Sequence, residues 1–80
     1  NPSNVIKYAL PSDSKVSLKV YSLNGELLAD LVNSNLPAGY HDMVFNAANL
    51  SSCVYLYVID AAPLKGGNAF RQVKKMVLMK

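Results

Sequence analysis

The stretch VIKYALPSDSKVSLKVY, residues 5–21, decides the fold class of this 80-residue chain. Two runs in it, residues 5–10 and 15–21, alternate apolar side chains with polar or small ones. Successive side chains of a β-strand point to opposite faces, so this period of two predicts two half-buried strands. The proline-led polar segment PSDS, residues 11–14, lies between them as a turn. We therefore expect the two strands to pair as a hairpin.

A second turn signal, Asn24-Gly25, follows directly. It is the strongest short signal for a hairpin, because both residues tolerate the positive φ that a type I′ turn requires. The next segment, ELLADLV at residues 26–32, is ambiguous, since its apolar positions also fit a helical spacing. We favour a strand because the segment is short, follows Asn-Gly and is ended by NSNLPAG, residues 33–39.

Towards the C-terminus the same signals continue. They predict a strand at 40–47, a turn at 48–52, a strand at 54–59, a loop at 62–68 and a last strand at 70–80. In the first of these strands, His41, Met43 and Phe45 share one face. The segment VYLYVI, residues 54–59, is apolar on both faces, as a central strand buried in a sandwich would be.

About seven short strands, one every 8 to 12 residues or so, and no convincing helix predict an all-β fold. We expect a small antiparallel β-sandwich of immunoglobulin or fibronectin type. It is not a true immunoglobulin domain, because the sequence has no Cys…Trp…Cys pattern. The expected core consists of Ile6, Tyr8, Leu10, Val16, Leu18, Val20, Leu28, Phe45, Tyr55, Tyr57, Ile59, Met76 and Leu78.

The composition narrows the class of protein. Hydrophobic residues make up 51% and charged residues 16% of the chain, which argues against disorder. No apolar run approaches the roughly 20 residues of a membrane-spanning helix, and no signal peptide is visible. The protein is therefore expected to be either cytosolic or a piece of a longer secreted chain, and the start on Asn1-Pro2 suggests a piece. The last ten residues are basic but hold no aromatic side chain to stack on bases, so we expect no nucleic-acid partner.

The sequence offers few residues that could form a catalytic or metal site. Cys53 is the only cysteine and His41 the only histidine. A Cys-His dyad would also need an orienting group and an oxyanion site, to which nothing in the sequence points. The scattered acidic residues do not follow a calcium-loop spacing. We expect no catalytic residue, no metal and no cofactor.

Five short motifs follow one another along the chain. They are NP at 1–2, LP at 10–11 with VYSLNG at 20–25, AGYH at 38–41, LSSCVYLY at 50–57 and KKMVLMK at 74–80. In this order they resemble the type A C-terminal sorting domain of type IX secretion substrates, over nearly the whole chain. They are also similar to the immunoglobulin-like domain of flagellar hook-capping proteins. Two features depart from the family: Cys53 stands where glycine is usual, and the loop at 61–70 is longer.

The resemblance implies a single sorting domain, residues 1–80, excised from a larger secreted protein of a Bacteroidetes-like bacterium. Such a domain directs a covalently attached N-terminal passenger through the periplasm and the outer membrane by the type IX secretion machinery. A sortase-like protease then removes the domain and can join the passenger to a lipopolysaccharide at the cell surface. The domain itself would be a ligand and not an enzyme, with no cofactor and no membrane-spanning segment.

Recognition by the export apparatus is expected on the last strand. The residues concerned are Lys74, Lys75, Met76, Val77 and Lys80. A terminal strand can be recognised by its charges and, through strand addition, by its backbone edge. In the alternative interpretation these lysines only prevent edge-to-edge aggregation.

The other motif residues, Gly25, Gly39, His41, Cys53 and Tyr55, are expected to be structural. For His41 we expect ring packing and one hydrogen bond. We expect Cys53 to pack as a small buried residue at the start of a core strand, strained only if the family's glycine there has a positive φ. For Tyr55 and Tyr57 the choice lies between core tyrosines bonded at the rim and a sugar-binding platform.

A different class of function stays open. The same sandwich could be a fibronectin-like structural spacer, a hook-cap-like domain, or a glycan-binding accessory module of an extracellular enzyme.

Overall fold

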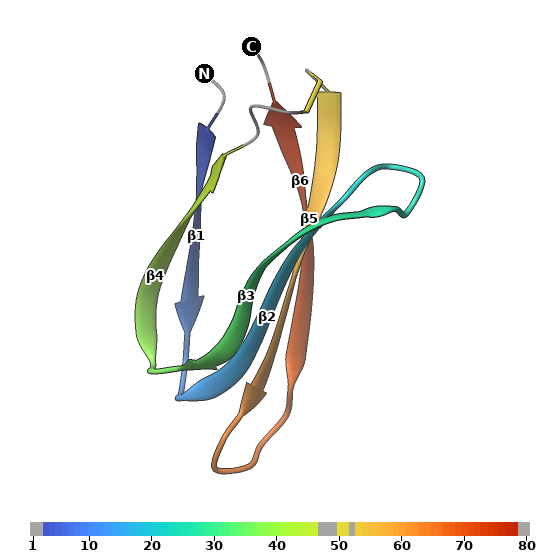
Figure 1. Ribbon diagram of the computed structural model, residues 1–80. Helices are drawn as coiled ribbons and strands as arrows, with labels where there is room; N and C mark the ends of the chain where they lie inside the picture. The colour runs from blue at the N-terminus through green and yellow to red at the C-terminus, as the bar shows by residue number, and fades with distance from the viewer. Residues whose placement is uncertain (1–2, 47–49, 52, 79–80) are drawn as a thin grey trace.

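The computed structural model describes residues 3–46, 50–51 and 53–78, and it contains strands and no helix in these ranges (Figure 1). The all-β prediction is therefore confirmed, with six strands where about seven were expected. The strands are β1 (Ser3–Leu10), β2 (Ser14–Tyr21), β3 (Leu27–Leu36), β4 (Gly39–Asn46), β5 (Cys53–Pro63) and β6 (Phe70–Leu78).

The strands form two sheets, in which every pairing is antiparallel. β1 and β4 make a two-stranded sheet, and the other sheet has the order β3-β2-β5-β6. Figure 1 shows the smaller sheet lying against one side of the larger one. The predicted antiparallel β-sandwich is thus confirmed.

The expected hairpin of residues 5–10 with 15–21 is wrong. β1 pairs with β4, whereas β2 pairs with β3 and β5. The segment between β1 and β2 is a corner that carries the chain from one sheet to the other. Asp13 fixes this corner: its side chain accepts a hydrogen bond from the Ala38 N–H at 2.8 Å, and its backbone carbonyl accepts one from the Leu64 N–H at 2.9 Å.

The hairpin at Asn24-Gly25 is confirmed, but its turn is not type I′. No described residue other than glycine has a positive φ, so Asn24 lacks the conformation that this turn requires. Gly25, with φ of 91°, donates its N–H to the Ser22 carbonyl at 3.0 Å. The Ser22 N–H donates to the Glu26 carbonyl at 2.9 Å and closes a longer loop.

The pairing of β3 with β2 explains why residues 26–32 also fitted a helical spacing. Its register against β2 shifts twice, between Leu18 and Lys19 and between Val20 and Tyr21. Each shift adds a residue to β3 and turns two adjacent side chains towards the core. The four side chains packed there are Leu28, Ala29, Leu31 and Val32. The strand also continues to Leu36, beyond the end at residue 32 that we expected.

The core lies between the two sheets and agrees with the predicted set. Its buried members are Ile6, Leu10, Val16, Leu18, Val20, Phe45, Tyr55, Ile59, Ala61, Met76 and Leu78. Three other predicted residues, Tyr8, Leu28 and Tyr57, are partly buried and pack against this cluster. Ala61 was not foreseen. In residues 5–21, the alternation therefore identified which sides of β1 and β2 face the core.

Candidate interaction surface on the C-terminal strand

β6 lies at one edge of the four-stranded sheet. Among the described residues it pairs only with β5, so its other edge has no neighbouring strand. Met76 and Leu78 are 8% and 1% exposed and anchor the strand in the core. Lys74, Lys75 and Val77 are exposed. Of the residues predicted to be recognised, three therefore lie on the surface and Met76 lies inside, while Lys80 falls outside the described residues.

The two lysines lie on opposite faces of the sheet. Lys74 is opposite Tyr57 on the core-facing side, and Lys75 is opposite Leu56 on the outer side. They therefore flank the free edge of β6 from both faces. Within the part of the chain that the structure describes, neither lysine forms an ion pair. Both cations are available to a partner that approaches this edge.

The third cation of β6 is already paired. Arg71 donates two hydrogen bonds to Asp60 across the β5–β6 ladder, from Nε to Oδ1 at 2.8 Å and from the guanidinium to Oδ2 at 3.3 Å. This contact lowers the pKa of the Asp60 carboxyl and raises the pKa of Arg71. The net positive charge of β6 is therefore carried by Lys74 and Lys75.

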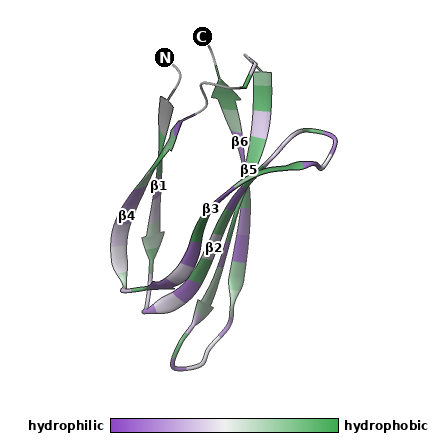
Figure 2. Ribbon diagram, in the orientation of Figure 1, coloured by the Kyte–Doolittle hydropathy of each residue, from purple (hydrophilic) through white to green (hydrophobic). Residues whose placement is uncertain are grey.

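The outer side of the four-stranded sheet is also apolar, which the sequence did not lead us to expect. We call it the outer apolar face, formed by Leu27, Val54, Leu56, Val58, Val73 and Val77. In Figure 2 the ends of β5 and β6 that carry Val54 and Val77 are coloured mainly hydrophobic. The expectation that residues 54–59 would be buried on both faces is wrong, because no described segment covers this side. The apolar side chains on both sides of residues 54–59 were nevertheless the sequence signal for the outer apolar face.

Cys53 is exposed at the start of β5, so the expected burial of its thiol is wrong. It is opposite Leu78 at the last pair of the β5–β6 ladder, where the sheet ends. Its φ is not positive, so a cysteine at this position brings no backbone strain.

We expect the Cys53 thiol to react with a maleimide or disulfide reagent in the native protein about as fast as in the unfolded protein. An exposed thiol at a strand end is accessible to reagent without unfolding. The rate is followed by absorbance with and without denaturant. Native-state protection by more than about tenfold would show that the thiol is covered.

His41 makes the ring contact and the single hydrogen bond that we expected. Its ring stacks on Tyr8, with centroids 5.4 Å apart and planes 23° apart. Its Nε2 lies 2.7 Å from the Pro37 carbonyl, which can only accept, so this nitrogen donates. Burial raises the pKa of Tyr8. Gly39 has a φ of 122° where the chain enters β4, a conformation that suits glycine.

Tyr55 and Tyr57 both point to the core side, so the structure favours core tyrosines over a sugar platform. Tyr55 is 7% exposed, and its hydroxyl donates to the Ser51 carbonyl at 2.8 Å. Tyr57 is partly buried and packs against the core.

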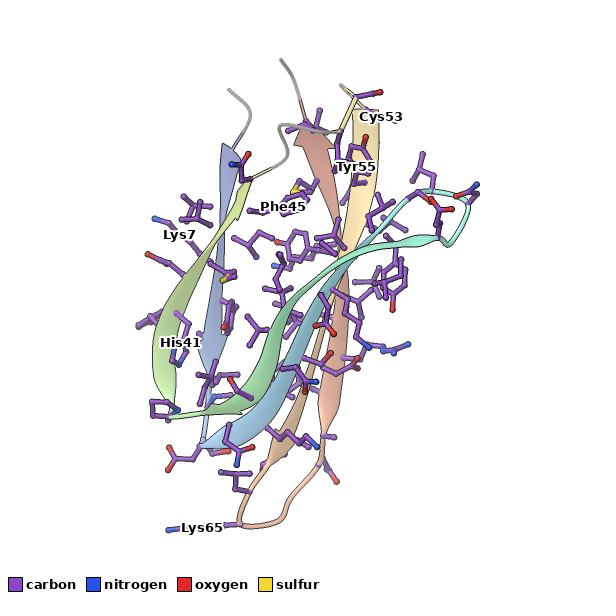
Figure 3. All side chains as sticks on the ribbon, viewed as in Figure 1. Lys7, His41, Phe45, Cys53, Tyr55 and Lys65 are labelled. Carbon is purple, nitrogen blue, oxygen red and sulfur yellow. The ribbon has the colours of Figure 1, made fainter. Side chains whose placement is uncertain are left out.

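The candidate dyad of Cys53 and His41 is not assembled. Figure 3 shows the two side chains at opposite ends of the sandwich, Cys53 on β5 and His41 at the start of β4. No group of three histidine, cysteine or acidic side chains gathers at metal-binding distance in residues 3–46, 50–51 and 53–78. None of the described segments is a helix long and apolar enough to cross a membrane.

Comparison of the chain with protein-family models, with curated proteins and with solved structures finds no match.

Proposed function

We propose that this domain is a non-enzymatic sorting module, which directs an attached passenger protein through the outer membrane by type IX secretion. The observation that carries the proposal is the state of β6. Among the described residues it is an edge strand whose two lysines, one on each face of the sheet, form no ion pair. The resemblance of the motif order to type IX sorting domains supports type IX secretion as the export route.

In this account the export apparatus recognises the folded domain and not an extended peptide. Met76 and Leu78 are buried, so they hold β6 in the sheet and fix the direction of its neighbouring exposed side chains. A partner strand can then add to the free backbone edge, and acidic groups of the partner can pair with Lys74 and Lys75. The domain supplies a surface and performs no chemistry.

The passenger, in the same proposal, precedes residue 1 and is released by a sortase-like protease of the apparatus. Figure 1 shows that β1 begins at the end of the sandwich where β6 finishes. A passenger joined there would leave the domain beside the C-terminal end of β6. The apparatus would therefore meet the recognition strand and the cleavage region on the same side of the domain.

The test is a fusion of residues 1–80 behind a reporter with an export signal, expressed in a bacterium that has the type IX apparatus. We expect the reporter at the cell surface or in the medium. The matched control is the same reporter without the domain, which should stay in the periplasm. Periplasmic retention of the intact, folded fusion would contradict sorting and favour the structural spacer.

A further inference from the structure

The free edge of β6 is regular, and part of it is open on both faces. The β5–β6 ladder runs from Cys53 with Leu78 to Ala61 with Phe70 without a register shift. The other edge strand of the same sheet, β3, has two such shifts, and bulges hinder the addition of a further strand. Residues 71–75 are all exposed, so the described segments cover neither face of β6 there. Of the two edges of the larger sheet, β6 is therefore the better suited to accept a strand.

The positions of the two lysines limit the shape of the partner. Adjacent residues of a strand point to opposite faces, and Lys74 lies on the core side of the sheet while Lys75 lies on the outer side. A helix or a flat surface that docks on one face of the sheet meets only one of them. A strand that adds to the edge of β6 continues both faces and meets both lysines. Their arrangement therefore favours an extended segment.

The charge of β6 determines the charge of that segment. The strand, FRQVKKMVL, contains no acidic residue, and Arg71 is already bonded to Asp60. Two copies of β6 placed edge to edge would bring cations together, which is unfavourable. An added strand with acidic side chains opposite Lys74 and Lys75 forms two cross-strand pairs of opposite charge instead. An acidic segment is therefore favoured over a second copy of β6.

The neighbours of the lysines add an apolar requirement. On the outer side, Val73 and Val77 lie on either side of Lys75 and are 56% and 53% exposed. Apolar residues of an added strand opposite these valines would remove apolar surface from water. On the core side, the next residue is the buried Met76, where an apolar neighbour extends the core. The complementary strand is therefore acidic at its centre and apolar on both sides of it.

We propose that β6 binds an extended segment in which two consecutive acidic residues lie opposite Lys74 and Lys75, with apolar residues on both sides of this acidic pair. Because the acidic residues are consecutive, one carboxylate reaches each face of the sheet. The inference rests on the proposed function, which takes β6 as the recognised strand, and it adds the chemistry of the partner segment.

The test uses two synthetic peptides with blocked ends and the same composition, Thr-Val-Val-Glu-Glu-Val-Thr and Thr-Val-Glu-Val-Glu-Val-Thr. In the second peptide both glutamates point to one face of a strand, so only one lysine can be paired. Each peptide is titrated into the isotopically labelled 80-residue chain and followed by the amide NMR signals. We expect the first peptide to bind with a dissociation constant on the order of 0.1–1 mM and to shift residues 71–77 most. The second should bind about two- to fivefold more weakly.

A charge exchange tests the same contact from the side of the protein. Lys74→Glu with Lys75→Glu should weaken binding of the first peptide more than about tenfold and should favour Thr-Val-Val-Lys-Lys-Val-Thr. The matched control is Lys7→Glu with Lys65→Glu, two exposed sites outside β6, which should bind the first peptide like the unaltered chain. Circular dichroism checks that each variant folds. If the β6 variant does not fold, the comparison of the two glutamate peptides on the unaltered chain decides by itself.

Equal affinities of the two glutamate peptides would overturn the proposal, as would shifts centred outside β6 or no binding up to about 5 mM. The measurement uses no export apparatus, so it can fail separately from the fusion experiment. Export of the reporter fusion together with equal peptide affinities would contradict strand addition by an acidic pair and leave the sorting function standing.

Discussion

Phe45→Ala is expected to lower the free energy of unfolding by about 3–5 kcal/mol. Phe45 is 5% exposed and reaches from β4 of the small sheet into the core against the large sheet. An 80-residue domain has roughly 4–12 kcal/mol in total, so this single cavity removes a large part of its stability. Urea unfolding followed by circular dichroism measures the change.

The control for this substitution is Tyr40→Ala. Tyr40 is an aromatic residue on the same strand but is 93% exposed. Its loss should change the stability by no more than about 0.5 kcal/mol. Similar effects of the two substitutions would show that the two-stranded sheet does not pack on the core as described.

Leu18→Ala is expected to cost about 2–5 kcal/mol by the same measurement. Leu18 is fully buried, and β2 is an inner strand that pairs with both β3 and β5. The truncation leaves a cavity that neighbours held in two ladders cannot easily fill. A Leu18→Ala variant that is unfolded even without denaturant would agree with this expectation, because a domain of this size has a thin core.

Leu23→Ala makes the same chemical change at a site that is 63% exposed, in the loop between β2 and β3. We expect a change within about 0.5 kcal/mol. If Leu18→Ala were as mild as this control, β2 would not be the centre of the core.

The sequence predicted which sides of β1 and β2 face the core, and the reason is local. In residues 5–21 the alternation of apolar and polar side chains reports directly on the two faces of a strand. The buried residues Ile6, Leu10, Val16, Leu18 and Val20 confirm it. Alternation does not say which strand lies alongside, because two strands in opposite sheets present the same pattern to a shared core. The wrong pairing of β1 with β2 has this cause.

Other departures depend on tertiary contacts that a local pattern does not contain. The register shifts of β3 turned adjacent side chains inward and imitated a helical spacing. Cys53 was expected to be buried because the strand after it is apolar, but the sheet ends there and nothing in the described residues covers it. The ring contact of His41 could be expected, because its spacing to Phe45 places it on the side of β4 where Tyr8 lies.

For the interaction surface, the sequence predicted a basic last strand but not how its charges lie. The register of β6 against β5 places Lys74 and Lys75 on opposite faces of one free edge. It also buries Met76. This residue therefore packs in the core and is not exposed to a recognition partner. The outer apolar face could be predicted only with the order of the strands in the sheet, because its members come from three strands.

The most direct test of the proposed function is export of the reporter fusion carrying Lys74→Ser with Lys75→Ser. These changes remove the two cations of β6 that form no ion pair with any described residue, and they keep Met76 and Leu78 in the core. Both side chains are exposed, so the stability should change by no more than about 0.5 kcal/mol per site. The matched control is Lys7→Ser with Lys65→Ser, which removes the same charge at exposed sites away from β6.

We expect the β6 variant to retain the reporter in the periplasm with an unchanged melting temperature, while the control variant exports it normally. Surface delivery of the β6 variant at the level of the control would contradict recognition through the lysines of β6.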